Sequence, residues 1–290
     1  MRFTDKVCLV TGGTSGIGQA TCIRLGAEGG VVIVLGRDAT DGAETVGTIT
    51  KAGGQAVFMA CDLAKPRAIE STVKKVITKY QRVDVLICDA AMMTFDPLIK
   101  LPLDQWDLLM QVNLRSLAQL TQLCLPHMPK GSAIVAISSV HAHQTTAGVV
   151  PYATSKGAME AFVRGMSREL NFRQVRINAV APGAVDTPML WSNPNVKSGA
   201  EKIDKATVGQ PEELAAAIAF MASSEASFIH GTTLTVDGAG WRSCNRQPGL
   251  RLGIGHSALS SAASLAISKE NLEQQEALPA ERYSVCLSFS

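Results

Sequence analysis

The stretch Thr11-Gly12-Gly13-Thr14-Ser15-Gly16-Ile17-Gly18 decides the fold of this chain. It directly follows the apolar run at residues 7–10, and a helical pattern begins within it. Glycines are needed at such a strand-to-helix turn because side chains would keep the backbone away from a pyrophosphate. The first turn of the helix also offers free N–H groups and a positive dipole end to phosphates. Its place between a strand and a helix therefore predicts a dinucleotide site.

The same alternation of strand and helix continues along the chain. Amphipathic segments at residues 68–80, 103–125 and 152–170 predict helices between apolar runs. These runs are nearly continuous in Val, Ile and Leu, as expected for parallel strands buried on both faces. We expect an α/β fold, a Rossmann-type doubly wound parallel sheet of about seven strands with helices on both faces. The predicted strands are residues 7–10, 31–35, 56–60, 83–87, 133–138, 175–180 and 232–236.

The composition changes after Trp241. We expect residues 1–241 to form the dinucleotide-binding domain, because the predicted sheet is complete there. Residues 242–290 have few apolar clusters and a Ser/Ala-rich patch at residues 257–268. They are interpreted as a poorly ordered C-terminal extension, and an arm that packs on a neighbouring subunit is the alternative.

Charge and cysteine content narrow the class of protein. The 27 basic and 25 acidic residues give a net charge of +2, which favours neither nucleic acid nor an anionic membrane as a partner. The seven cysteines are scattered, without a Cys-x-x-Cys pair, as expected for buried thiols in a reducing compartment. No apolar stretch reaches the roughly 18 residues of a membrane span, and the N-terminus does not resemble a signal peptide. We expect a cytoplasmic protein.

A catalytic constellation is predicted further along the chain. Tyr152 and Lys156 lie four residues apart in a helical segment, hence on one face. This spacing alone is weak evidence, but Ser139 follows a predicted strand and Asn113 lies in the helix before it. With the TGxxxGxG spacing of the loop, residues 4–240 resemble the short-chain dehydrogenase/reductase family, whose Asn-Ser-Tyr-Lys tetrad falls on these four positions.

The resemblance implies a role for each member of the tetrad. Tyr152 would be the general acid/base, Ser139 would hydrogen-bond the substrate oxygen, and Lys156 would hold the nicotinamide ribose. A free tyrosine has a pKa of about 10, so a cationic Lys156 nearby is expected to lower it. Asn113 would bend its helix and hold a water that relays protons to Lys156. The cofactor supplies the hydride.

The resemblance also implies a set of cofactor-binding residues. It comprises the glycine loop, the residues after three later strands, and three members of the tetrad: Thr11, Gly12, Ser15, Gly16, Ile17, Gly18, Arg37, Asp62, Leu63, Asp89, Ala90, Asn113, Tyr152, Lys156, Pro182, Gly183, Val185 and Thr187. One segment departs from the family pattern, because Cys88-Asp89-Ala90-Ala91 stands where Asn-Asn-Ala-Gly is usual. Ala91 restricts the backbone there, and Asp89 brings a possible charge.

The choice of cofactor depends on the end of the second predicted strand. Gly36 occupies the position of the acidic residue that would accept a hydrogen bond from the ribose of NAD, and Arg37 follows it. A basic side chain there pairs with a 2′-phosphate, so we expect NADP rather than NAD. The neighbouring Asp38 leaves NAD open as the alternative.

The substrate is expected to be a small-molecule secondary alcohol or ketone. His141, Met189 and Trp191 are candidates for the substrate wall, the last two in a segment (189–207) that resembles the family's mobile lid. His141 and His143 lack the further ligands of a metal site, and none is expected. By family resemblance we expect a homodimer or homotetramer, joined through residues 103–125 and 152–170.

Two rival functions stay open. An epimerase or dehydratase of the extended type would normally have a TGxxGxxG loop and a longer C-terminal substrate domain. A non-catalytic dinucleotide-binding protein would have the same fold, and the altered segment at residues 88–91 favours it.

Overall fold

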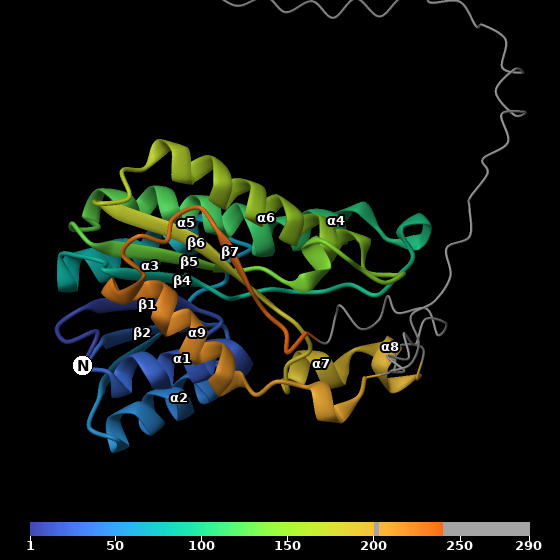
Figure 1. Cartoon of the computed structure of the whole chain (residues 1–290), viewed down its shortest axis with the longest axis horizontal. Coiled ribbons are helices and arrows are strands. Elements are labelled where there is room, and N and C mark those ends of the chain that lie inside the picture. The colour runs from blue at the N-terminus through green and yellow to red at the C-terminus, as the bar shows by residue number, and fades with distance from the viewer. Residues whose placement is uncertain (200–202, 240–290) are drawn as a thin grey trace, which may run out of the picture. The chain divides into compact units, whose positions relative to one another are not determined.

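Seven apolar runs form one parallel sheet in the computed structural model, which describes residues 1–199 and 203–239 (Figure 1). The strand order is β3-β2-β1-β4-β5-β6-β7, and every neighbouring pair is parallel. The strands are β1 (Val7–Thr11), β2 (Val31–Gly36), β3 (Gln55–Ala60), β4 (Val85–Cys88), β5 (Ser132–Ile137), β6 (Val175–Pro182) and β7 (Thr233–Val236). The predicted doubly wound sheet is confirmed.

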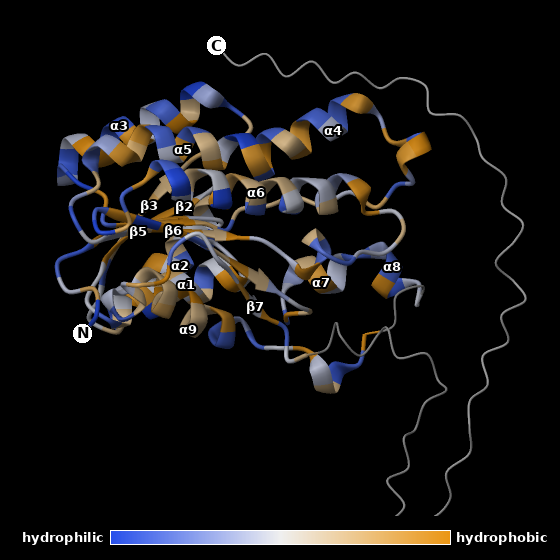
Figure 2. Cartoon of the chain, turned by 45° about the horizontal axis from the view of Figure 1, so that its top comes forward, coloured by the Kyte–Doolittle hydropathy of each residue, from blue (hydrophilic) through white to orange (hydrophobic). Residues whose placement is uncertain are grey.

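Helices cover both faces of the sheet, because its strands are apolar on both sides (Figure 2). One face carries α1 (Gly16–Ala27), α2 (Ala39–Lys51) and α9 (Pro211–Ala222). The other carries α3 (Pro66–Tyr80), α4 (Leu103–Met110), α5 (Ser116–Cys124) and α6 (Val150–Glu169). Two short helices, α7 (Pro188–Ser192) and α8 (Pro194–Lys197), follow β6. None of the helices in the described ranges is long and apolar enough to cross a membrane.

The bounds of the predicted elements differ from the observed ones by at most two residues, except in one helix. β4 begins two residues later than expected: its pairing with β1 starts at Val85, opposite Cys8, and the N–H of Asp84 just before it bonds the carbonyl of Val7. The helix expected over residues 103–125 is interrupted by a π-helical turn, Gln111–Arg115, which contains Asn113. Such turns are rare and often lie at functional sites.

The strand order places the site. The chain adds β2 and β3 on one side of β1, then crosses to add β4 on the other side. The loops after β1 and β4 therefore diverge at the carboxyl edge of the sheet, where doubly wound proteins bind ligands. The expected extension at residues 242–290 lies outside the described residues.

Candidate active site

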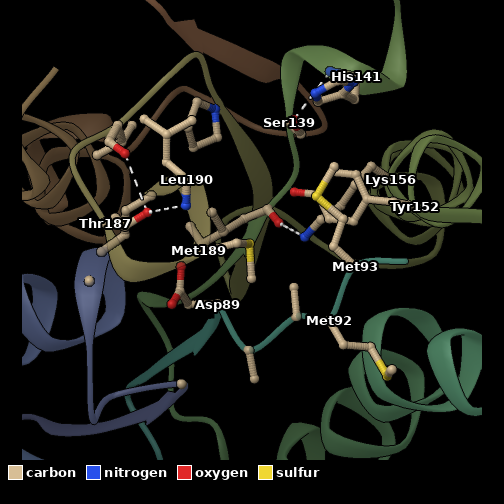
Figure 3. A pocket seen from close by; sticks show the side chains of 18 of the residues that line it. Asp89, Met92, Met93, Ser139, His141, Tyr152, Lys156, Thr187, Met189 and Leu190 are labelled. Atoms are coloured by element: carbon tan, nitrogen blue, oxygen red, sulfur yellow. Dashed lines mark hydrogen bonds between the residues drawn. The ribbon is translucent and has the colours of Figure 1, made fainter. Parts of the chain in front are cut away.

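A cavity of about 1220 Å³ opens at this edge (Figure 3). Its walls come from the glycine loop after β1, from the carboxyl ends of the six other strands, and from α4, α6 and α7. Most of the predicted site residues line it: Gly12, Ser15, Gly16, Ile17, Arg37, Asp62, Leu63, Asp89, Ala90, Ser139, His141, Tyr152, Lys156, Pro182, Gly183, Val185, Thr187 and Met189. Thr11, Gly18, Asn113 and Trp191 do not line it.

The glycine loop forms a cradle that side chains would fill. Gly12 has φ +69°, a left-handed conformation that favours glycine. A Cβ atom on Gly18 would lie 2.2 Å from the carbonyl oxygen of Gly12 and 2.6 Å from Oδ2 of Asp89. The helix start is therefore packed directly against the turn before it, as the third glycine of a dinucleotide fingerprint requires. This bare, close-packed backbone fits a pyrophosphate.

Thr11 acts from behind the loop. Its hydroxyl oxygen accepts the N–H groups of Asp89 and Ala90 at 3.0 and 3.1 Å. Thr11 is buried, and these bonds fix the end of β4 against β1. Its place in the site is thus to position residues 88–91 rather than to line the cavity.

At the far end of the cavity, Arg37 is exposed and follows β2. Asp38 caps α2, because its carboxylate accepts the N–H groups of Thr40 and Asp41 at 2.8 and 3.1 Å. The hydrogen bonds of that carboxylate therefore go to the start of α2. Asp62, after β3, accepts the N–H of Ala64.

Tyr152, Lys156 and Ser139 meet in the middle of the cavity, all three buried. The Ser139 and Tyr152 side chains are hydrogen-bonded. Lys156 Nζ lies 5.5 Å from the centre of the Tyr152 ring and donates to the carbonyl of Ile137 at 2.6 Å. Ser139 also caps the turn after β5, where its hydroxyl accepts the N–H of His141. α6 and the end of β5 thus bring a phenol, an ammonium and a hydroxyl together.

The acidity of Tyr152 differs from the expectation. Burial raises its pKa to about 12, and the hydrogen bond with Ser139 opposes this only in part. The expected lowering by Lys156 is not found: burial lowers the pKa of Lys156 to about 8, so its amine is neutral in the range where Tyr152 loses its proton. The nearby Asp89 opposes this lowering of the Lys156 pKa.

Asn113 lies behind the cavity rather than in it. Its amide oxygen accepts the N–H of Met92 at 2.8 Å, and its amide nitrogen donates to the carbonyl of Met92 and to Ser155 Oγ. The residue therefore ties the segment after β4 to α6, next to Lys156. The hydrogen bonds of its side chain go to Met92 and Ser155.

A second buried network supports the same loop. Glu160, one turn beyond Lys156 on α6, accepts from Ser138 Oγ at 2.8 Å and lies 2.9 Å from Nε2 of His143. Glu160 is buried, whereas His143 is largely exposed. His143 thus anchors the loop after Ser139. No cluster of three or more potential metal ligands occurs in residues 1–199 and 203–239.

The segment after β6 closes the cavity from the glycine-loop side. The Thr187 hydroxyl caps α7 at the N–H of Leu190 and donates to the carbonyl of Val185 (Figure 3). A Cβ atom on Gly16 would lie 3.0 Å from Thr187 Cγ2. The start of α7 therefore rests on the glycine loop.

The substrate side of the cavity is largely apolar. His141 stacks edge-on against Tyr152 at 5.8 Å, and burial lowers the pKa of His141 to about 4, so its imidazole is neutral. Met189 lines the cavity as predicted, but Trp191 does not. The indole of Trp191 instead donates to Asp186 at 2.6 Å.

Sequence reasoning missed several wall residues, among them Met92, Met93 and Leu108, whereas Leu190, which it placed in the apolar wall beside Met189, does line the cavity. Met92 and Met93 could have been found, because they directly follow residues 88–91 at the carboxyl end of a strand. Leu108 faces the cavity only because of how α4 is placed, which the sequence does not show.

Known proteins share this architecture and sequence. A family model described as enoyl-(acyl carrier protein) reductase matches residues 12–240. The chain is 34% identical to 3-oxoacyl-[acyl-carrier-protein] reductase FabG of Thermotoga maritima, a match over 82% of this chain and 98% of that protein. The chain belongs to the short-chain dehydrogenase/reductase family.

Other members of the family show its breadth. Cyclopentanol dehydrogenase of Comamonas is 32% identical over 82% of this chain and 97% of its own length. A short-chain dehydrogenase from Burkholderia cenocepacia, solved in complex with NADP, superposes with a TM-score of 0.76. It is 31% identical, and the match covers 82% of this chain and 98% of that one. The short-chain dehydrogenase/reductases are oxidoreductases, and this chain shares their fold and is similar to them in sequence.

Proposed function

We propose that this short-chain dehydrogenase/reductase interconverts a ketone and a secondary alcohol with NADP(H), with Tyr152 as the proton donor and acceptor. The observation that carries the proposal is the meeting of Tyr152, Ser139 and Lys156 in the cavity that the glycine loop borders. The glycine loop, Arg37, Asp62 and the segment from Pro182 to Thr187 would hold the cofactor, which supplies or accepts the hydride.

The side chains of the chain then handle the proton. As a carbonyl becomes an alcohol, negative charge develops on its oxygen, and a donor within hydrogen-bond reach must neutralise it. The Tyr152 hydroxyl is that donor, and Ser139, bonded to it, offers a second contact to the same oxygen. Lys156, whose Nζ lies 5.5 Å from the centre of the Tyr152 ring, is the basic side chain beside the phenolate that remains.

Tyr152 carries its proton at neutral pH. Burial raises the pKa of Tyr152 to about 12, so the phenol carries its proton throughout the neutral range. A protonated phenol is ready to donate to a ketone, whereas alcohol oxidation requires it first to lose that proton. In the reductive direction Tyr152 can therefore donate its proton directly to the substrate oxygen.

The substrate proposed for this cavity is an uncharged ketone with an apolar body. Met92, Met93, Leu108, Met189 and Leu190 form the wall beyond Tyr152. His141 adds a neutral imidazole, and uncharged polar side chains, among them Gln144 and Asn195, also line the cavity. An apolar wall favours burial of hydrocarbon and disfavours a charged group.

The cofactor choice is tested by titrating the protein with NADPH and NADH in parallel, followed by cofactor fluorescence. We expect NADPH to bind more tightly, because Arg37 can pair with the 2′-phosphate. Replacing Arg37 by alanine should then weaken NADPH binding about 10- to 100-fold and leave NADH binding unchanged.

Arg67→Ala is the control, because this exposed arginine of α3 does not line the cavity. Equal loss of both cofactors in the Arg37 variant would contradict the pairing with phosphate. Failure of the unaltered protein to bind either cofactor would mean that residues 88–91 disable the site, and the non-catalytic function would replace this proposal.

We further propose that the protein is a homodimer or homotetramer, joined through residues 103–125 and 152–170, which form α4, α5 and most of α6. A groove on α5 and α6 is lined by Leu125, Phe162 and Met166 among others. Light scattering should give two or four times the chain mass of 30.6 kDa, and Phe162→Asp should shift the protein towards monomer. A monomer at all concentrations would contradict this.

A further inference from the structure

Asp89 is a carboxylate placed where the cofactor's own negative charge is expected. It follows β4, is partly exposed to the cavity, and points into it beneath Met189 (Figure 3). A Cβ atom on Gly12 would lie 2.9 Å from Asp89 Oδ2, and one on Gly18 would lie 2.6 Å from the same oxygen. The carboxylate is therefore in contact with both ends of the loop proposed to cradle the pyrophosphate.

The charged and titratable groups around Asp89 come from three elements. Lys156 and Tyr152 face it from α6, Cys22 from α1, and Cys88 precedes it on β4. Lys156 and the N–H of Gly18 stabilise the anion, whereas enclosure by the cavity wall destabilises it. Enclosure is the larger effect and raises the pKa of Asp89 to about 7. Lys156 is the only nearby cation among these groups, and it is the residue proposed to act beside Tyr152.

We propose that Asp89 couples dinucleotide binding to protonation, so that the site binds the cofactor with Asp89 as the neutral acid and takes up a proton when Asp89 is ionised. This inference rests on the proposed function, since it assumes that the cavity binds a dinucleotide. It makes Asp89 a determinant of cofactor affinity rather than a catalytic residue.

Two physical arguments support the proton uptake. A pyrophosphate on the glycine loop would bring negative charge towards a carboxylate that contacts the same loop, and like charges at a shared site favour the protonated form. A neutral carboxylic acid also has the planar shape of an amide. Like an amide, it offers a donor group on one side, O–H in place of N–H₂, and an accepting carbonyl oxygen on the other. Protonated Asp89 can therefore take the place of the asparagine that is usual at this position in the family.

The linkage fixes the direction of the pH dependence. Below the pKa of free Asp89, the residue is already neutral and binding is independent of this group. Above that pKa, Asp89 must take up a proton each time a cofactor molecule binds. The dissociation constant of the cofactor therefore increases with pH, by up to tenfold for each pH unit. The effect ends where the pKa of Asp89 in the complex is reached.

The experiment measures NADPH binding to the full chain between pH 6.5 and 9 by calorimetry, in two buffers of different ionisation enthalpy. We expect uptake of up to one proton per NADPH at pH 8. Asp89→Asn should abolish the part of the uptake due to Asp89 and bind NADPH at least about tenfold more tightly than the unaltered protein at pH 8.5. NADH, which lacks the 2′-phosphate, should show the same difference in proton uptake and in affinity between the unaltered protein and Asp89→Asn.

Infrared difference spectroscopy separates Asp89 from Lys156, which can also take up a proton. Addition of NADPH at pH 8 should produce the carbonyl band of a protonated carboxyl group, and the band should be absent in Asp89→Asn. Asp204→Asn is the matched control: it removes a carboxylate at the same cavity while an asparagine can keep the cap on the N–H of Ala206. It should retain both the uptake and the band.

The outcomes are distinct. Equal pH dependence in the unaltered protein and Asp89→Asn, or absence of the carboxyl band, would overturn the proposal about Asp89 and leave the proposed function intact. Absence of cofactor binding at every pH in both proteins would overturn the proposed function itself.

Discussion

Replacing Tyr152 by phenylalanine is expected to lower kcat/KM for ketone reduction about 10²- to 10⁴-fold, the usual contribution of a general acid. The substitution removes only the hydroxyl, so the edge-on packing of the ring against His141 at 5.8 Å can persist. The dissociation constant for NADPH should stay within about threefold, because the glycine loop and Arg37 are untouched. Steady-state kinetics with an apolar ketone and fluorescence titration measure the two quantities.

Tyr80→Phe is the control for this variant. Tyr80 ends α3 far from the cavity, with its ring in contact with the ammonium of Lys79 at 5.1 Å. Removal of the Tyr80 hydroxyl should leave kcat/KM unchanged. Turnover near the unaltered level in Tyr152→Phe would exclude the phenol as proton donor, and parallel loss of NADPH binding would mean that the hydroxyl supports the cofactor site.

Most of the fold could be predicted from the sequence, because strands buried on both faces leave a strong local signal. The runs that became β1, β2 and β5 are continuous in apolar residues, and each predicted boundary lies within one residue of the observed one. The π-helical turn around Asn113 could not be located from the sequence, because the amphipathic pattern of the helix predicted over residues 103–125 continues through the turn. That turn depends on tertiary contacts of Asn113 with Met92 and Ser155.

The site was predictable where backbone chemistry constrains residue type, and less so where side chains only fill space. Gly12 and Gly18 are dictated by close approach, so the loop could be placed in advance. Trp191 does not line the cavity as predicted, because the sequence does not show whether an aromatic side chain next to a cavity faces into it or away from it. Here the indole N–H donates to the carboxylate of Asp186. The raised pKa of Tyr152 depends on burial, which spacing along a helix does not reveal.

Replacing Gly18 by alanine is expected to weaken NADPH binding about 10- to 100-fold and to lower the melting temperature by several degrees. The added Cβ would lie 2.2 Å from the oxygen and 2.7 Å from the carbon of the Gly12 carbonyl. These are backbone atoms, so no side-chain rotation relieves the clash and the turn must move. The N–H of Gly18 that stabilises Asp89 would move with it. Fluorescence titration and thermal unfolding measure the two effects.

Gly47→Ala separates the clash from the general effect of a glycine-to-alanine change in a helix. Gly47 lies in α2, and a Cβ atom there would have nothing within 4 Å. That variant should bind NADPH normally and be as stable as the unaltered protein, or more stable by up to about 1 kcal/mol. If Gly18→Ala also bound NADPH normally and kept its stability, the loop would have room for a side chain at residue 18. The close packing of Gly18 against Gly12 would then be contradicted. The cradle would then not be the feature that brings the backbone close to the pyrophosphate, and cofactor affinity would have to come from Arg37 and the strand ends instead.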